Sequence, residues 1–233
     1  MIPNITVSIS GLPKSGKNWL SYTFPEPLKI YCFNGGADFV AKKFPDKAIT
    51  VHNFVLPIIE SDVEEWALPV WNEFYPEYNK DVVSGEYSTL VLDTGSEVES
   101  FCRQATLEEL RETRPNKIKL ATNEYLARNL RMNALFARAR NSGVNLVTLQ
   151  YLREQWRKEK GSERAEPTGE LGLDGWNQTE AQADVNIWME TKEKAGKPVM
   201  IATIKSNRFD RDLNGKSFED TTYDEIVALM FGE

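Results

Sequence analysis

Apolar residues in this chain cluster in short runs separated by glycine, proline and charged positions. The runs at residues 5–9, 28–33, 88–94 and 144–150 have the length and the Val, Ile and Leu content of buried β-strands. A less regular run at 51–59 indicates one more strand. Segments with helical spacing alternate with these runs, and this alternation predicts an α/β fold with a mostly parallel central sheet flanked by helices.

Two long stretches between the runs favour helix. Residues 61–78 carry aromatic side chains at roughly helical spacing after Ser61 and Glu64, which resemble a capping box, and we interpret the aromatic residues as core. Residues 100–140 are rich in arginine, mostly on a solvated helix face, and Gly143 is expected to end this helix.

The C-terminal third follows a different pattern. Residues 151–180 are polar with little periodicity, which predicts a long, mobile loop of the kind that is usually functional. Residues 183–191 and 199–205 predict an antiparallel hairpin, and 223–231 predict a short helix. We expect one domain over residues 1–233.

A glycine-rich stretch joins the first strand to the first helix and has the pattern G-x-x-x-x-G-K. Glycines let backbone N–H groups converge on phosphate oxygens, and the lysine reaches the β- and γ-phosphates, so the stretch predicts a nucleoside triphosphate site. The nucleotide-binding residues are expected to be Gly11, Leu12, Pro13, Lys14, Ser15, Gly16, Lys17, Asn18 and Trp19. No N-K-x-D-like guanine-binding motif is evident, which favours ATP.

Two residues are expected to hold Mg²⁺ with the nucleotide. Asp93 ends the run at 88–94, at the sheet edge where ligands of open α/β sheets bind. Asn18 stands where this motif normally has a Ser or Thr hydroxyl, so we expect weaker metal binding rather than none. Gln150 ends the run at 144–150 and is expected to lie beside the γ-phosphate.

Composition narrows the possibilities. The formal net charge of −7 argues against a generally basic protein that coats nucleic acid. No run approaches membrane-spanning length and no signal-peptide pattern is present, so we expect no membrane partner and a cytoplasmic location. Cys32, Cys102 and the lone His52 receive no chemical role.

The order of these parts over residues 5–208 resembles the RecA-like ATPase core, and especially the small RecA-like ATPases that bacteriophages encode beside recombination and single-strand annealing functions. The resemblance implies a P-loop fold with a C-terminal antiparallel hairpin, and self-association into a ring or filament. It implies that Gln150 couples the γ-phosphate to a DNA-binding loop at 151–180. Lys205 and Arg208, as cations at the hairpin tip, would reach the nucleotide of a neighbouring subunit.

This chain departs from that family at the general base, because the region after the second strand lacks the expected glutamate. Asp38 and Glu97 are the substitutes we consider, and with Asn18 this departure predicts slow hydrolysis. The loop would bind single-stranded DNA, and other recombination proteins are possible partners. Its expected DNA contacts are Arg153, Trp156, Arg157, Lys158, Lys160 and Arg164.

Three alternatives stay open at this point. Glutamates within the loop could neutralise its cations, which would leave it merely solvated. A small-molecule P-loop kinase would use the loop as a lid over an acceptor and Arg208 as a clamp within one subunit. A nucleotide-gated switch would bind ATP with little hydrolysis.

Overall fold

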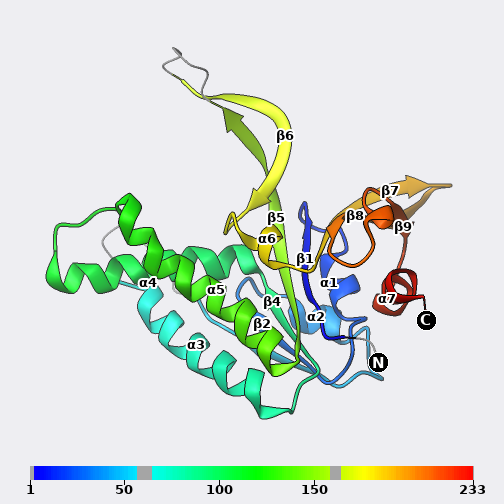
Figure 1. The fold of residues 1–233 in the computed structure, drawn as a ribbon, viewed down its shortest axis with the longest axis horizontal. Coiled ribbons are helices and arrows are strands. Elements are labelled where there is room, and N and C mark those ends of the chain that lie inside the picture. Colours follow the sequence, from blue (N-terminus) through cyan, green and yellow to red (C-terminus); the bar gives the residue numbers. More distant parts are fainter. Residues whose placement is uncertain (1–2, 57–64, 158–163, 233) are drawn as a thin grey trace.

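A single twisted sheet organises the chain (Figure 1). The computed structural model describes residues 3–56, 65–157 and 164–232, and over these the strand order is β3-β2-β4-β5-β1-β7-β8-β9, with β6 paired to β5. The parallel strands are β1 (Thr6–Gly11), β2 (Leu28–Cys32), β3 (Ile49–Asn53), β4 (Thr89–Asp93), β5 (Asn145–Arg157) and β7 (Val185–Lys194). The antiparallel additions are β6 (Glu166–Asp174), β8 (Lys197–Asn207) and β9 (Ser217–Glu219). The predicted α/β fold with a C-terminal antiparallel hairpin is confirmed.

Helices cover the sheet on both faces, and the central strands β1 and β4 are therefore buried along their whole length. The helices α1 (Lys17–Ser21), α2 (Ala37–Ala41) and α7 (Tyr223–Phe231) pack on one face. The helices α3 (Ala67–Ser84), α4 (Gly95–Thr113) and α5 (Tyr125–Ser142) pack on the other face. The short α6 (Thr179–Gln182) precedes β7, and the 3-10 turns η1 (Thr122–Glu124) and η2 (Arg211–Leu213) lie in connections.

The helix predictions need two corrections. The stretch predicted at 100–140 is two helices, since α4 ends at Thr113 and Pro115 follows two residues later. The helix predicted at 61–78 begins at Ala67 and continues to Ser84, and Ser61 and Glu64 lie outside the described residues. The aromatic residues of α3 are core, as predicted, with Trp71 and Phe74 buried. Gly143 ends α5 with a φ of 67°, and α7 has the predicted bounds.

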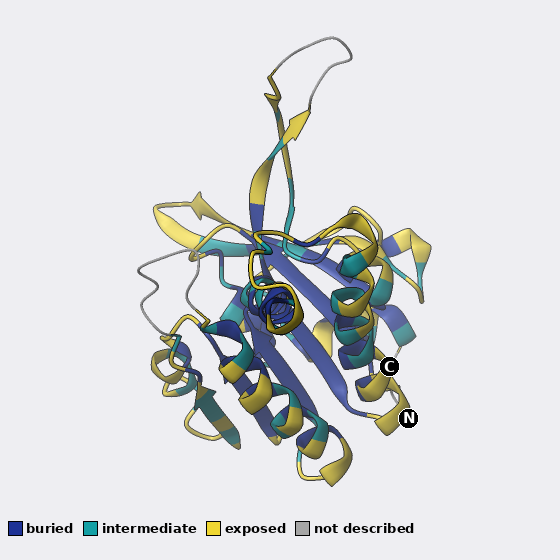
Figure 2. Ribbon diagram, turned by 90° about the vertical axis from the view of Figure 1, so that its left-hand side faces the viewer, coloured by how far each residue is buried: buried dark blue, intermediate teal, exposed yellow. Residues whose placement is uncertain are grey.

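The largest difference concerns residues 151–180, where the prediction of a long loop is wrong for the described part. Strand β5 continues to Arg157 and returns as β6, and the two strands form an antiparallel ribbon that stands away from the body of the molecule (Figures 1 and 2). We call the part of this ribbon beyond Tyr151 and Asp174 the arm. Most of its residues are exposed on both faces, so the alternation of apolar and polar positions that reveals a strand is missing from the sequence.

Among the described residues, no helix is long and apolar enough to cross a membrane.

Candidate nucleotide site

The turn between β1 and α1 forms the phosphate-binding loop. Gly16 has a φ of 92° and Lys14 a φ of 65°, so two residues of the turn adopt the left-handed conformation. A side chain at Gly11 would collide with the Ser15 side chain and with the Met189 carbonyl oxygen of the neighbouring strand. The glycines of the motif are therefore required by close approach and by backbone conformation.

Lys17 is buried at the centre of the site. Its Nζ donates hydrogen bonds to the carbonyl oxygens of Gly11 (2.9 Å) and Leu12 (2.8 Å), and lies 5.0 Å from the ring centroid of Tyr151. Burial lowers the pKa of Lys17 to about 8, although the charge of Asp93 acts in the opposite direction. A cation so poorly solvated has much to gain from phosphate oxygens in place of two carbonyls.

Asn18 and Asp93, the two predicted metal ligands, are in direct contact. Asn18 Nδ2 donates to Asp93 Oδ2 over 2.6 Å, which leaves the amide oxygen of Asn18 and the second carboxylate oxygen for other partners. Burial raises the pKa of Asp93 to about 6, against the opposing effects of Asn18, Lys17 and Asn34. The strand end at Asp93 thus holds a carboxylate that benefits from a cation.

These residues fit a magnesium nucleotide. A cavity of about 570 Å³ is lined by residues 14–19 together with Asn34, Met200 and Asp220. Ser15 Oγ is buried in the cradle and has no hydrogen-bond partner within the described part of the chain. Two oxygen ligands suit Mg²⁺, which usually takes one or two protein ligands and the phosphates of its substrate. The described residues hold no group of three or more His, Cys, Asp or Glu that would bind a metal alone.

Sequence reasoning missed three residues of this cavity region. Tyr151 and Asn34 meet beside Lys17, where Asn34 Nδ2 donates to the Tyr151 hydroxyl over 3.1 Å. Asp220, in the connection after β9, has a φ of 44°, and its Oδ1 accepts from the Met200 backbone N–H over 2.9 Å. These residues come from the turn after β2, from β5 and from the connection after β9, so only the folded chain brings them to this region, and no local motif marks them. Trp19 lies at the rim, 43% exposed, with its ring against Phe44.

Gln150 lies on the opposite face of the sheet from Lys17. Its Nε2 donates to Thr148 Oγ1 and Thr179 Oγ1, both over 3.2 Å, and its Oε1 faces Gly175. Successive residues of a strand point to opposite faces, so Tyr151, and not Gln150, is the strand-end side chain beside the P-loop lysine. The sequence predicted Gln150 at this position, and the structure has Tyr151 there instead.

The two candidate general bases occupy different places. Asp38 is exposed on α2 and accepts a hydrogen bond from Asn53 Nδ2 over 2.6 Å. Glu97 lies in the first turn of α4, four residues after Asp93, and lines a polar cavity of about 370 Å³ together with Tyr151 and Asp174. Burial and the nearby Asp174 charge raise the pKa of Glu97.

The two cations expected at the hairpin tip lie elsewhere, because residues 194–197 form the tip of the β7–β8 hairpin. Lys205 sits near the far end of β8 with its Nζ 4.1 Å from the Trp188 ring centroid. Arg208 forms an ion pair with Asp184 over 2.8 Å, and the other carboxylate oxygen of Asp184 accepts from the Thr6 backbone N–H. Thr6 begins β1, so Arg208 lies at the opposite end of the sheet from its own P-loop.

The expected DNA contacts lie along the arm. Arg153 forms an ion pair with Asp174 over 3.2 Å at the base of the arm, and Trp156 is 63% exposed. Arg157 ends β5 and Arg164 precedes β6, both exposed. Lys158 and Lys160 lie outside the described residues.

A phosphate-binding loop and an acidic strand end, set at one edge of a parallel sheet, define a P-loop nucleoside triphosphatase. The profile of a family described as "AAA domain" matches residues 3–211, and the chain belongs to this family. No curated protein matches the chain. A crystal structure of a KaiC-like protein from the hyperthermophilic archaeon Pyrococcus horikoshii OT3 is similar, with 14% identity and a TM-score of 0.51 over 93% of this chain and 85% of that chain. This likeness concerns the fold.

Proposed function

We propose that the protein is a slowly hydrolysing ATPase that binds single-stranded DNA under the control of its nucleotide, in recombination or strand annealing. One observation carries the proposal: β5 runs from Tyr151, beside Lys17, to the exposed Trp156 on the arm. A hydrogen-bonded strand of this kind transmits a displacement at the nucleotide to a surface outside the body of the protein.

The residues of the site suit phosphoryl transfer to water. Hydrolysis forms a bond between a water oxygen and the γ-phosphorus and breaks the bond to the β–γ bridging oxygen. Lys17 offsets the charge on the phosphate oxygens, and Glu97, whose pKa is raised, accepts the proton of the attacking water. Asn18 and Asp93 would hold Mg²⁺, which offsets phosphate charge when bound. The amide at position 18 in place of a hydroxyl accounts for slow turnover.

Self-association into a ring or filament is part of the proposal, and the position of Arg208 supports it. The six-residue strand β1 separates Thr6 from the P-loop by about 16 Å at about 3.3 Å per residue, so Arg208 does not reach the nucleotide of its own subunit. A cation at the far end of the sheet meets a nucleotide only in a head-to-tail contact between copies, and such a contact propagates.

The same geometry disfavours the small-molecule kinase. That function needs a lid over the acceptor, whereas the arm projects away from the body of the protein (Figure 2). It also needs Arg208 as a clamp within one subunit, which the distance along β1 prevents. In the remaining alternative, the nucleotide-gated switch, ATP is bound with little hydrolysis and a partner protein takes the place of DNA.

The test is the ATPase rate of the purified protein with and without a single-stranded oligonucleotide. We expect a slow basal rate that rises with the oligonucleotide and is lost in Lys17→Ala. ATP binding without turnover in either condition would favour the switch. A rate that depends on a small-molecule acceptor and not on DNA would favour the kinase.

A further inference from the structure

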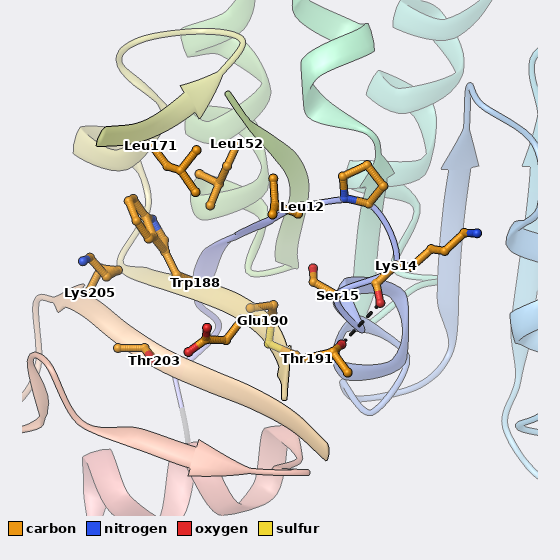
Figure 3. A pocket seen from close by; sticks show the side chains of 12 residues that line it. Leu12, Lys14, Ser15, Leu152, Leu171, Trp188, Glu190, Thr191, Thr203 and Lys205 are labelled. Carbon is orange, nitrogen blue, oxygen red and sulfur yellow. Dashed lines mark hydrogen bonds between the residues drawn. The ribbon is translucent and has the colours of Figure 1, made fainter. Parts of the chain in front are cut away.

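A second cavity, of about 580 Å³, lies on the other side of the P-loop turn (Figure 3). Three pairs of side chains form much of its wall: Leu12 and Lys14 from the turn, Leu152 and Leu171 from the base of the arm, and Trp188 and Lys205 from β7 and β8. We call this cavity the arm groove. It lies where the arm leaves the sheet, between the P-loop turn and the paired strands β7 and β8.

The side chains of the arm groove combine apolar surface with positive charge. Leu12 is 50% and Leu171 42% exposed, which is unusual for leucines that face one another across a cavity. Lys14 and Lys205 form no ion pair with any described residue, and the single carboxylate in the lining, Glu190, is paired with Lys192 over 2.7 Å. The groove therefore has a surplus of cations in a chain whose net charge is −7.

Trp188 is the aromatic wall of the arm groove. The Lys205 ammonium lies 4.1 Å from its ring centroid, a cation–π contact that holds the charge at the groove. The indole Nε1 is buried and has no hydrogen-bond partner among the described residues. An indole N–H without an acceptor is costly in a folded protein, so this unpaired donor sets Trp188 apart from the apolar residues of the lining.

We infer that the arm groove binds a short stretch of single-stranded DNA, with a base against Trp188 and the leucines and with phosphates held by Lys14 and Lys205. Sequence-tolerant single-strand sites are built from this combination of an aromatic or apolar surface and cations that follow the backbone. The inference rests on the proposed function and assigns the DNA site to the base of the arm. The arm itself is a weaker candidate, because its Arg153 is already paired with Asp174.

The position of the arm groove links it to the nucleotide. Lys14, Ser15 and Thr191 line both cavities, so the turn that cradles phosphate is also a wall of the groove. Thr191 Oγ1 donates to the Lys14 carbonyl oxygen over 3.4 Å, which ties this turn to β7. DNA in the groove and ATP in the cradle therefore contact opposite sides of the same residues, and each changes the affinity for the other.

Photo-crosslinking tests the location directly. The full-length protein is irradiated with an oligothymidylate that carries 5-iododeoxyuridine, and adducts are mapped by mass spectrometry. We expect adducts at Trp188. Adducts confined to Trp156 or to residues 158–163 would overturn the assignment of the DNA site to the arm groove while leaving DNA binding intact. A protein that gives no adducts and does not bind the oligonucleotide in solution would overturn the proposed function as well.

Two variants with matched controls give a second readout, the dissociation constant for a fluorescent oligothymidylate. Leu171→Glu is compared with Leu229→Glu, a leucine of similar exposure (45%) on α7, and Lys205→Glu with Lys216→Glu, an exposed lysine before β9. We expect each groove variant to bind about tenfold more weakly, as for the loss of one stacked base or phosphate contact. We expect the two control variants to bind as tightly as the unmodified protein. Groove and control variants that bind alike would overturn the inference. Thermal unfolding of all four confirms that they fold.

Discussion

The Lys17 ammonium lies 5.0 Å from the ring centroid of Tyr151, whose hydroxyl accepts a hydrogen bond from Asn34 at 3.1 Å. One tyrosine thus joins the P-loop lysine, the end of β2 and the strand that becomes the arm. When phosphates draw Lys17 away from the carbonyls of Gly11 and Leu12, the cation above this ring moves too. Tyr151 is therefore the residue through which we expect the nucleotide to act on the arm.

Replacement of Tyr151 tests this role. Tyr151→Leu removes the ring, and we expect ATP to lose much of its effect on DNA affinity, with only the direct contact through the shared P-loop turn left, while ATP itself still binds. Tyr151→Phe keeps the ring over Lys17 and loses the Asn34 hydrogen bond, which should weaken ATP binding by about two- to tenfold and preserve the coupling. The measurement is the DNA dissociation constant with and without ATP. Full coupling in Tyr151→Leu would show that the signal takes another route.

Burial of Asp93 predicts a pH dependence of stability. Because its pKa in the folded protein is raised to about 6, the native state binds more protons than the unfolded state between about pH 4 and 6. Stability therefore falls as the pH rises through this window. Asp93→Asn keeps an oxygen that accepts from Asn18. Without nucleotide, this variant should therefore be more stable than the unmodified protein by about 1 to 3 kcal/mol at pH 8, with little difference at pH 4.

Urea denaturation at both pH values measures this effect, with the exposed Asp212→Asn as the control. The Asp93→Asn change also removes the negative charge that interacts with the Lys17 ammonium, and this loss reduces the expected gain in stability. A free Asp93→Asn protein that is less stable than the parent at pH 8 would contradict the assigned burial cost. The same variant should lose magnesium-dependent ATP binding.

Asn18 sets the metal requirement. Asn18→Thr supplies the hydroxyl ligand typical of this motif, so we expect half-maximal ATPase activity at a severalfold lower Mg²⁺ concentration and a faster rate. Asn18→Ala provides no ligand and should raise the Mg²⁺ requirement. Magnesium titrations of the ATPase rate compare the three proteins. Identical titration curves would show that position 18 does not contact the metal.

Arg208 is expected to act on a neighbouring subunit. Arg208→Ala should lower turnover by about 10³-fold or more, as for loss of an arginine finger, with little change in nucleotide affinity. Mixing it with Lys17→Ala should partly restore activity, because intact sites form where the two kinds of subunit meet. Arg211→Ala, a 94% exposed neighbour, is the control. A mixture as inactive as its components would contradict the intersubunit contact.

The sequence predicted the parts of this molecule that depend on local pattern. Buried strands, the P-loop and the helix at 223–231 follow from apolar runs and glycines, which act over a few residues. The position of Asp93 at the end of a buried strand was also predicted, since ligands of open α/β sheets bind at that edge. Each of these features is set within one element or between adjacent ones.

What the sequence did not reveal depends on distant pairing. The arm is polar on both faces and so lacks the alternation that marks a half-buried strand. The side of the sheet that Gln150 faces depends on strand register, and a shift of one residue exchanges it with Tyr151. Arg208 lies far from its own P-loop because β8 runs antiparallel to β7. No motif within residues 205–208 indicates this strand direction.

The most direct test of the central claim is the anisotropy of a fluorescent oligothymidylate titrated with the protein at two salt concentrations, with and without Mg²⁺ and ATP. We predict that ATP changes the DNA affinity of the unmodified protein severalfold, that binding weakens steeply with salt, and that Lys17→Ala binds DNA with no response to ATP. An oligothymidylate that stays unbound at low salt, or an affinity that ATP leaves unchanged, would contradict the account.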